Sequence, residues 1–298
     1  MSWLLASIVC ALTVLTMASA AISWRTWRRL RLYRSDVQLY RTELLELATD
    51  VGALRRYVSV SHARQLTAAV PGRLPIRCLA QHGEDSLLWD LLGEKLVGYY
   101  VEIGAHNGVN LSNTYFFESI GWRGLLVEAH PELAEMCRRA RPGSIVVHAA
   151  LGPPNAGDRT RFSMVQGAHG VDALSFTIAN DSHLSRIRRE GGEIVEVDVP
   201  RTTLSQLLEQ EQPQSIDFMT IDVEGAELDV LLGADLERWR PRVLVVEDNS
   251  MGSDPRVRDY LQQFGYRRLL RCGCNDIYSL YPDTASSMVG CSTELDSN

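Results

Sequence analysis

The sequence predicts an α/β domain built on a mostly parallel β-sheet, and three observations carry this prediction. Short apolar runs rich in β-forming residues recur along the chain. Intervals long enough for a helix separate these runs, as the crossover connections between parallel strands require. The 298 residues are 45% hydrophobic and 22% charged, close to globular averages. The length allows one large domain with appendages and argues against a chain of many domains.

A membrane anchor is predicted over residues 1–24. The run from Trp3 to Trp24 carries no charge, and about 20 apolar residues suffice to cross a bilayer as a helix. A basic cluster follows directly, formed by Arg25, Arg28, Arg29, Arg31 and Arg34. Such clusters stay on the cytoplasmic side, so we expect a single-pass protein with its main domain in the cytosol. A cleaved signal peptide is the alternative, because Ala18-Ser19-Ala20 resembles a cleavage site, but no basic region precedes the apolar run.

Residues 25–67 are predicted to be a basic juxtamembrane segment and a coiled-coil-like stalk. Apolar residues recur there in alternating steps of four and three, at Tyr33, Val37, Tyr40, Leu44, Leu47, Val51, Leu54 and Val58. This seam favours a homo-oligomer, although the same pattern suits a helix that lies against a globular domain or a membrane surface. Two prolines and a glycine break the helix between Ala68 and Pro75. We therefore place the main domain at residues 76–281 and a loose tail at 282–298.

Charge and cysteine usage narrow the possible functions. The net charge is −7, and without the five arginines of the basic cluster it is −7 − 5 = −12. An acidic main domain argues against binding to the phosphates of a nucleic acid. The six cysteines show neither a CxxC pair nor the spacing of a zinc site. The sequence therefore indicates neither a disulfide framework nor a structural metal.

The main domain is predicted to alternate strands and helices. Buried parallel strands are expected over residues 99–103, 124–128, 144–148, 216–221 and 242–247. Helices are expected over residues 86–96 and 226–238. The alternation is lost between Gly152 and Pro200, where two antiparallel strands are expected over residues 161–165 and 193–199. An insertion of this kind usually shapes a ligand site.

The first candidate site is the segment from Glu102 to Gly108. Ligands of parallel sheets bind beyond the carboxyl ends of the strands, so the residues after each strand are the candidates. Gly104 allows a sharp turn against a ligand, and Gly108 allows the next helix to begin close to it. A dinucleotide fingerprint would need a second glycine where this chain has His106. The segment suits a ligand without a pyrophosphate, such as S-adenosylmethionine.

Two further strand ends carry acids. Glu128 ends the second strand, where a carboxylate can accept hydrogen bonds from both hydroxyls of an adenosine ribose. The alternative is an ordinary exposed carboxylate. Asp222, Glu224 and Glu227 follow the strand at 216–221. Three carboxylates so close together are unfavourable without a role, although helix capping can explain one or two of them.

The order of these motifs resembles the FkbM-type methyltransferases, a family of S-adenosylmethionine-dependent enzymes. The segments that carry the resemblance are Gln81–Asp85, Val101–Ala105, Leu126–Pro131, Ala149–Gly152 and, most distinctively, Ile221–Glu227. It extends from about Ala80 to Tyr281 and implies a Rossmann-like class I methyltransferase fold, with helices on both faces of the sheet. The implied reaction is O-methylation of a hydroxyl on a sugar, glycolipid or other metabolite.

The resemblance also implies roles for individual residues. The residues placed at the cofactor are Glu102, Gly104, Ala105, His106, Gly108, Glu128 and Ala129. Asp222 takes the position where the methyl group meets its acceptor, and Glu224 is grouped with it as catalytic. The segment from Gln81 to Asp85 either folds over the cofactor or caps the following helix.

Several points stay open at the level of sequence. The proton of the acceptor hydroxyl can pass to Asp222 or Glu224, or to His106 or His130 if either faces the cleft. A divalent metal on Asp222, Glu247 and Asp248 is an alternative, and we expect the metal-free mechanism because no diagnostic ligand spacing is present. A catalytically degenerate, membrane-tethered scaffold and a nucleotide-dependent oxidoreductase are the rival functions.

Overall fold

The computed structural model describes residues 51–67, 74–167, 171–177 and 181–280, together with Ser23, Trp24 and Trp27. Residues 1–22 of the anchor predicted over residues 1–24, most of the predicted stalk and the predicted tail lie outside these residues. Within them, no helix combines the length and the apolar character that a bilayer span requires. Contacts divide the chain into two units, residues 1–54 and 55–298. The fold and the candidate site belong to the second unit.

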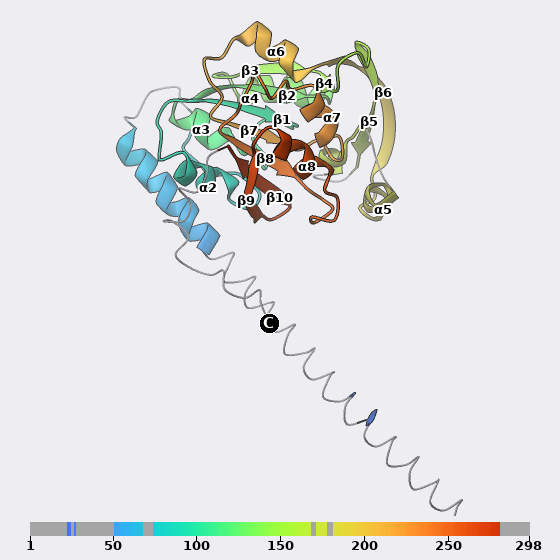
Figure 1. Cartoon of the computed structure of the whole chain (residues 1–298), viewed down its shortest axis with the longest axis horizontal. Helices are drawn as coiled ribbons and strands as arrows, with labels where there is room; N and C mark the ends of the chain where they lie inside the picture. Colours follow the sequence, from blue (N-terminus) through green and yellow to red (C-terminus); the bar gives the residue numbers. More distant parts are fainter. Residues whose placement is uncertain are drawn as a thin grey trace, which may run out of the picture. The chain divides into compact units, whose positions relative to one another are not determined.

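The second unit alternates helices and strands (Figure 1). The helices are α2 (Glu84–Leu91), α3 (Tyr115–Ile120), α4 (Pro131–Ala140), α5 (Asp181–Arg189), α6 (Leu204–Glu211), α7 (Glu227–Leu232) and α8 (Arg256–Gln263), with a 3₁₀ turn η1 (Val171–Leu174). The strands are β1 (Tyr99–Ile103), β2 (Arg123–Glu128), β3 (Ile145–His148), β4 (Ala150–Leu151), β5 (Arg159–Gln166), β6 (Glu193–Thr202), β7 (Phe218–Ile221), β8 (Val243–Glu247), β9 (Arg267–Cys272) and β10 (Asn275–Ser279).

The main sheet has seven strands in the order β3-β2-β1-β7-β8-β10-β9. The five strands from β3 to β8 are parallel, and β10 runs antiparallel to both of its neighbours. All five predicted parallel strands are present, which confirms the predicted α/β fold with its Rossmann-like arrangement. The hairpin of β9 and β10 was not predicted, and it makes the sheet mixed.

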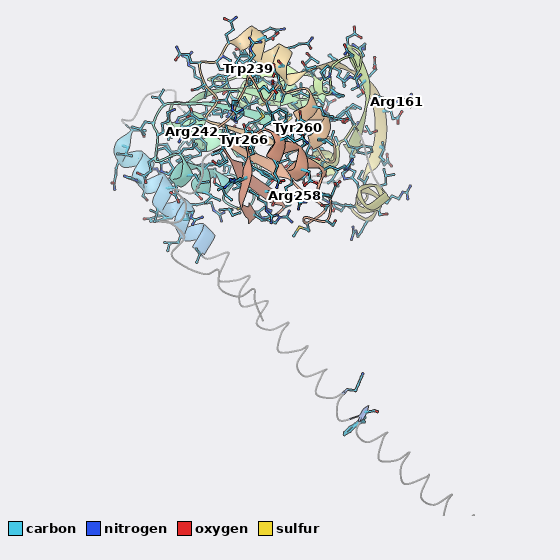
Figure 2. The ribbon with its side chains drawn as sticks, viewed as in Figure 1. Arg161, Trp239, Arg242, Arg258, Tyr260 and Tyr266 are labelled. Carbon is cyan, nitrogen blue, oxygen red and sulfur yellow. The ribbon has the colours of Figure 1, made fainter. Side chains whose placement is uncertain are left out.

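The predicted insertion forms a smaller sheet beside the main one, in the order β4-β6-β5 (Figure 1). β5 pairs antiparallel with residues 193–200 of β6, which confirms the two strands expected here. Arg161 of β5 forms an exposed ion pair with Glu196 of β6 at 3.2 Å and lies on the outer side of this hairpin (Figure 2). The inner side of the hairpin carries the apolar Phe162, Met164 and Val199.

Helices cover both faces of the main sheet, because successive side chains of a strand point to opposite faces. In β1, Val101 and Ile103 belong to a cluster that includes residues of α6, α7 and α8. Tyr100, between them, belongs to a cluster that includes residues of α2, α3 and α4. Tyr266 is buried on the α8 side (Figure 2), and its hydroxyl donates to the carbonyl of Pro241 at 2.8 Å. The two clusters confirm the expected helical layers.

The last part of the predicted stalk packs against this domain. Residues 51–66 are helical, and within the second unit Val60 and Ala63 belong to the cluster on the α2 side. His62 Nδ1 also lies 2.9 Å from a carboxylate oxygen of Glu94. Residues 55–66 therefore follow the alternative prediction for the stalk, in which the helix lies against a globular domain. Val58 of the predicted seam is exposed, and self-association through this seam stays a prediction.

Two predicted helices differ from the observed ones. The helix expected over 226–238 is wrong in length, because α7 ends before Gly233, whose backbone lies against that of Gly152. A Cβ atom on Gly233 would come within 2.2 Å of the Gly152 carbonyl oxygen. The helix expected over 86–96 begins earlier and ends at Leu91, since Gly93 leaves the helix with φ +68°.

A buried arginine, Arg141, ties α4 to the loop after β1. Its guanidinium is fully buried and lies 2.8 Å from Glu118 and 3.6 Å from Glu102. Five further groups complete the network: Tyr100, Ser112, Thr114 and the Gly108 carbonyl accept hydrogen bonds from Arg141, and the Gly143 N–H donates to Glu118. A buried charge of this kind is stable only when it is paired and hydrogen-bonded.

We expect Arg141→Leu to lower the free energy of unfolding by about 3 to 5 kcal/mol, because it leaves two buried carboxylates without their cation. Urea denaturation measures the change. Arg139→Leu, two residues earlier in the last turn of α4, is the matched control, since Arg139 is exposed and its pair with Glu135 lies in solvent. The control should change the unfolding free energy by less than about 1 kcal/mol. Equal effects of the two substitutions would contradict the structural role of Arg141.

Candidate active site

A cavity of about 770 Å³ opens at the carboxyl ends of β1, β2, β7 and β8. The chain order of the sheet reverses between β1 and β7, which is where ligands of such sheets bind. The predicted site residues that line the cavity are Glu102, Gly104, Ala105, His106, Glu128, Ala129, Asp222 and Glu224. The structure therefore brings all but one of the predicted residues together.

Gly104 is the point of closest approach between β1 and β7. Its φ is +82°, a conformation that favours glycine, and a Cβ atom would come within 1.7 Å of the Asp222 carbonyl oxygen. The N–H of Asp222 donates to the carbonyl of Ile103 at 3.0 Å, and the N–H of Gly104 donates to that of Val127 at 2.9 Å. These contacts fix the first turn of the cavity wall next to Asp222.

Glu102 and Gly108 were predicted to contact the cofactor. In the structure they stabilise the loop after β1 and do not present free polar groups to a ligand. The Glu102 carboxylate accepts hydrogen bonds from Ser112 Oγ, Thr114 Oγ1 and the Asn113 N–H, and it lies beside Arg141. Gly108 is the predicted residue outside the cavity lining. Its Cα packs on α4, where a Cβ atom would come within 2.8 Å of Cys137 Sγ. The close approach that requires this glycine is therefore to α4.

Glu128 lies at the end of β2 with its carboxylate held from two sides. Oε2 accepts from the N–H of His106 and Oε1 from the N–H of His130, both at 2.7 Å. Each oxygen keeps a further lone pair for a ligand hydroxyl. Burial raises the pKa of Glu128 to about 7, although these backbone donors oppose the shift.

His106 and Asn113 offer polar atoms that have no hydrogen-bond partner among the described residues. Both ring nitrogens of His106 and Oδ1 of Asn113 are enclosed and make no hydrogen bond there, and both residues line the cavity. His106 Nε2 lies 3.4 Å from Asp172 of η1. His130, by contrast, caps α4 by accepting the N–H of Leu133 at 3.5 Å, and it does not line the cavity. His130 is therefore a poor candidate for the base.

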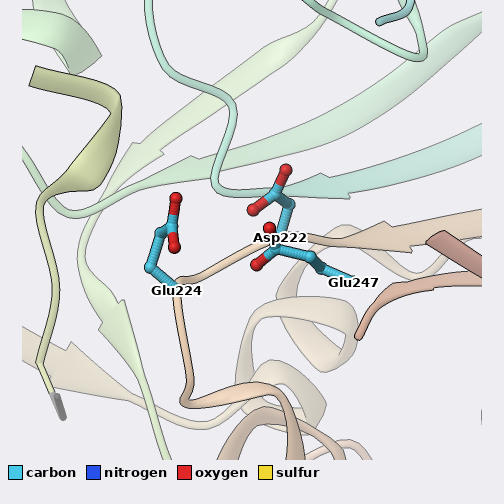
Figure 3. Close-up of side chains that lie close together, drawn as sticks. All are labelled: Asp222, Glu224 and Glu247. Carbon is cyan, nitrogen blue, oxygen red and sulfur yellow. The ribbon is translucent and has the colours of Figure 1, made fainter. Parts of the chain in front are cut away.

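Asp222 and Glu247 end two neighbouring parallel strands and lie side by side in the cavity (Figure 3). Asp222 has its exposed surface in the cavity, whereas Glu247 is 7% exposed. The surrounding protein raises the pKa of both carboxyl groups, and each is raised further by nearby negative charge. Asp248 is not part of this group, because its carboxylate is bound by Arg271, Ser250 and Gly252.

Glu224 lies beside this pair with a backbone φ of +52° and is bound by the insertion. Its carboxylate is 3.3 Å from His183 Nδ1 and 3.6 Å from Arg186, both of α5. His183 Nε2 also lies 2.9 Å from the Leu174 carbonyl oxygen, so both ring nitrogens face acceptors. The hydrogen bond to Glu224 raises the pKa of His183 accordingly. Glu224 thus joins the insertion to the carboxyl ends of the main sheet.

The third acid of this segment, Glu227, holds the turn before α7. Its carboxylate accepts the N–H groups of Gly225 at 2.9 Å and Val223 at 3.4 Å, and α7 has no side-chain cap. Glu227 does not line the cavity. The capping expected for Asp222 or Glu224 is therefore not observed, and both of these acids face the cavity.

The segment from Gln81 to Asp85 lies partly at the cavity and partly at the start of α2, whose N-cap Gly83 has no side-chain cap. Gln81 and His82 line the cavity. The Asp85 carboxylate accepts the N–H groups of Leu79, Ala80 and Ser86 at the start of α2. The first two residues of this segment therefore border the ligand site, and the acid fixes the turn before the helix.

The insertion supplies much of the remaining wall. Its lining residues are Phe162, Asp172, Ala173, Ser175, Thr177 and Arg186. None of them was singled out from the sequence, although the insertion was expected to shape the site. A local motif could not have found them, because each reaches the cavity only through the pairing of β5 with β6 and the position of α5.

Comparison of the sequence with known proteins finds a methyltransferase family model and a curated relative. A family model described as "Methyltransferase FkbM domain" matches residues 102–268, more than half of the chain. "Methyltransferase sdnD" of Sordaria araneosa is 38% identical over 85 residues, which cover 25% of this chain and 33% of that protein. The match thus spans about one third of the length of this curated relative.

Two solved structures are similar to the chain at low sequence identity. The METTL16 MTase domain has a TM-score of 0.41 and 13% identity, over 76% of this chain and 80% of that one. An O-methyltransferase from Bacillus cereus in complex with SAH has a TM-score of 0.38 and 16% identity, over 78% of this chain and 96% of that one.

Proposed function

Because the chain belongs to the FkbM methyltransferase family, we propose that this methyltransferase uses S-adenosylmethionine to methylate a hydroxyl group held beside Asp222. The observation that carries this proposal is the single cavity that joins the Glu128 loop to the acids after β7 and β8. Its volume of about 770 Å³ lies within the usual range of about 300 to 1,000 Å³ for ligand sites, with room for two small molecules. The acceptor class that fits is a hydroxyl of a sugar, glycolipid or other metabolite.

The residues of the cavity fit the cofactor. Glu128 can accept hydrogen bonds from ribose hydroxyls while the N–H groups of His106 and His130 hold its carboxylate in place. Gly104 fixes the turn of the cavity wall after β1, because it packs closely against the backbone of Asp222. The unpartnered atoms of His106 and Asn113 offer further hydrogen bonds. These features lie in β2 or in the segments directly after β1 and β2, whereas Asp222 and Glu247 lie at the ends of β7 and β8.

The acids after β7 and β8 suit the acceptor. When bound, the cofactor supplies an electrophilic methyl group on a positively charged sulfur. The acceptor oxygen forms a bond to the methyl carbon as the carbon–sulfur bond breaks, and the hydroxyl proton must leave. Asp222 is the cavity-facing carboxylate that we assign to accept this proton, since a base within reach of the hydroxyl lowers the barrier. Holding oxygen, carbon and sulfur in line is the other contribution expected of the site.

The rival functions have less support. A degenerate scaffold would have no need to keep Gly104, Glu128 and Asp222 around one cavity. A nucleotide-dependent oxidoreductase would bind a pyrophosphate at the loop after β1. This chain has His106 there in place of the glycine that the dinucleotide fingerprint requires. The insertion, which provides Phe162, Asp172 and Arg186 to the wall, is the part that we expect to select the acceptor.

We expect Glu128→Ala to weaken binding of S-adenosylmethionine by about 1.5 to 3 kcal/mol, the range for hydrogen bonds to a charged group. Isothermal titration calorimetry measures the change. Because the pKa of Glu128 is raised to about 7, the carboxylate gains a proton as pH falls below that value. The affinity of the parent protein should therefore fall on acidification, and the variant should lack this dependence. Glu132→Ala, an exposed acid nearby, is the control; equal affinities for both variants would remove Glu128 from the site.

Asp222→Asn keeps the shape of the side chain but removes its basicity. We expect methyl transfer to slow by about 10² to 10⁴, the usual contribution of a general base, with little change in cofactor affinity. Release of S-adenosylhomocysteine, with an acceptor found by screening sugars and lipid-linked hydroxyls, measures the rate. A large loss of cofactor binding in this variant would instead assign Asp222 to the cofactor.

We also propose that the protein is anchored in a membrane by one span, with the methyltransferase domain in the cytosol. The support is the uncharged run from Trp3 to Trp24 and the arginines that follow it. Protease added to intact spheroplasts should leave the domain undigested, and detergent should make it accessible. Digestion of the domain before detergent is added would show that the orientation is wrong.

A further inference from the structure

We propose that Asp222 and Glu247, with Glu224 at the edge of the site, bind a divalent cation of the hard, oxygen-preferring class, such as Mg²⁺ or Mn²⁺, beside the acceptor hydroxyl. This inference rests on the proposed function for its role in the reaction. The sequence alone favoured a mechanism without metal, and it grouped Asp248 with the candidate ligands. The structure replaces Asp248 by Glu224 and brings the three carboxylates together (Figure 3).

The distances between the carboxylates match those of ligands on one cation. One oxygen from each of the three residues lies within 4.8 Å of the others. Oxygens bound to Mg²⁺ at about 2.1 Å can be at most about 4.2 Å apart, and those bound to Ca²⁺ at about 2.4 Å at most about 4.8 Å. The observed arrangement therefore needs only small side-chain adjustments to coordinate a cation.

Glu224 differs from the other two acids in how its charge is compensated. Glu224 has His183 and Arg186 as partners. Neither Asp222 nor Glu247 forms an ion pair with any lysine, arginine or histidine in the described part of the chain. Elsewhere in the domain, the buried carboxylates Glu102 and Glu118 share the buried Arg141. A bound cation would provide the same compensation for Asp222 and Glu247.

Glu247 gives a second observation besides the cluster itself. It is 93% buried, and its Oε2 is enclosed without a hydrogen-bond donor from any described residue. An enclosed carboxylate oxygen without a partner is unfavourable by several kcal/mol in general, and such atoms in native structures usually have a ligand, a water or a proton. Figure 3 shows the Glu247 carboxyl group directed at that of Asp222. The Glu247 carboxyl group, which carries the unpartnered oxygen, therefore points into the proposed site.

The chemistry of the ligands selects the class of cation. Carboxylate oxygens suit Mg²⁺, Mn²⁺ and Ca²⁺. The nearest soft candidate, Cys274, lines the same cavity, but its sulfur lies 3.7 Å from His82 Nε2, and the thiol pKa is raised to about 12 by burial. A neutral thiol is a poor metal ligand. A cation held by the acids would lower the pKa of an acceptor hydroxyl that contacts it and would position its oxygen.

Titration of the metal-free full chain with Mn²⁺, followed by electron paramagnetic resonance of the free ion, tests the proposal without an acceptor. We expect one ion per chain and an affinity at least about tenfold weaker in Glu247→Gln, as expected for loss of a charged ligand. Asp248→Asn is the matched control, because this neighbouring acid is bound by Arg271 instead. Its Mn²⁺ affinity should stay within about twofold of the parent, since exposed or separately paired acids contribute little.

Two results would overturn the proposal. The first is the absence of Mn²⁺ binding to the parent protein at millimolar concentrations. The second is equal Mn²⁺ affinity of the parent protein and Glu247→Gln. Either result would favour a proton shared between Asp222 and Glu247 in place of a cation. Circular dichroism confirms that the variants are folded, and Asp222→Asn provides a second ligand variant. Calorimetry with S-adenosylmethionine on the same samples separates the claims. Cofactor binding without Mn²⁺ binding rejects only the metal site, whereas Mn²⁺ binding without cofactor binding rejects the proposed function.

Discussion

The contact between Gly104 and the backbone of Asp222 is the constraint on which the site depends. It joins the carboxyl end of β1 to that of β7, the two strands between which the sheet reverses its order. A side chain at position 104 would meet the Asp222 carbonyl oxygen, so the close approach requires glycine. Because of this contact, the loop assigned to the cofactor and the acids assigned to the acceptor share one cavity.

The buried acids near this contact differ in whether a cationic side chain compensates them. On the α4 side, Arg141 compensates Glu102 and Glu118 and thereby holds the loop after β1 in a fixed shape. On the β8 side, Glu247 has no such cation among the described residues, and its carboxyl group is therefore available for chemistry. We infer that the Arg141 network serves stability, whereas the carboxyl groups near β8 serve function. In enzymes, carboxyl groups with perturbed pKa values are concentrated at functional sites.

The sequence predicted the fold and the strand-end residues because both depend on local patterns. Buried parallel strands are continuous apolar runs, and Glu128 and Asp222 directly follow or end such runs. The β9 strand was missed because it carries Arg267, Arg268 and Arg271 and therefore lacks an apolar run. Arg141, His183 and Arg186 were missed for another reason. Their roles depend on partners far away in the sequence, and no spacing within a motif reveals them.

A crystal structure of the protein with S-adenosylhomocysteine would test the central claim most directly. The account predicts that the ribose hydroxyls lie within hydrogen-bond distance of the Glu128 carboxylate. It also predicts that the sulfur faces the part of the cavity bordered by Asp222 and Glu247. A ligand bound with its ribose away from Glu128, or with its sulfur directed away from these acids, would contradict the account.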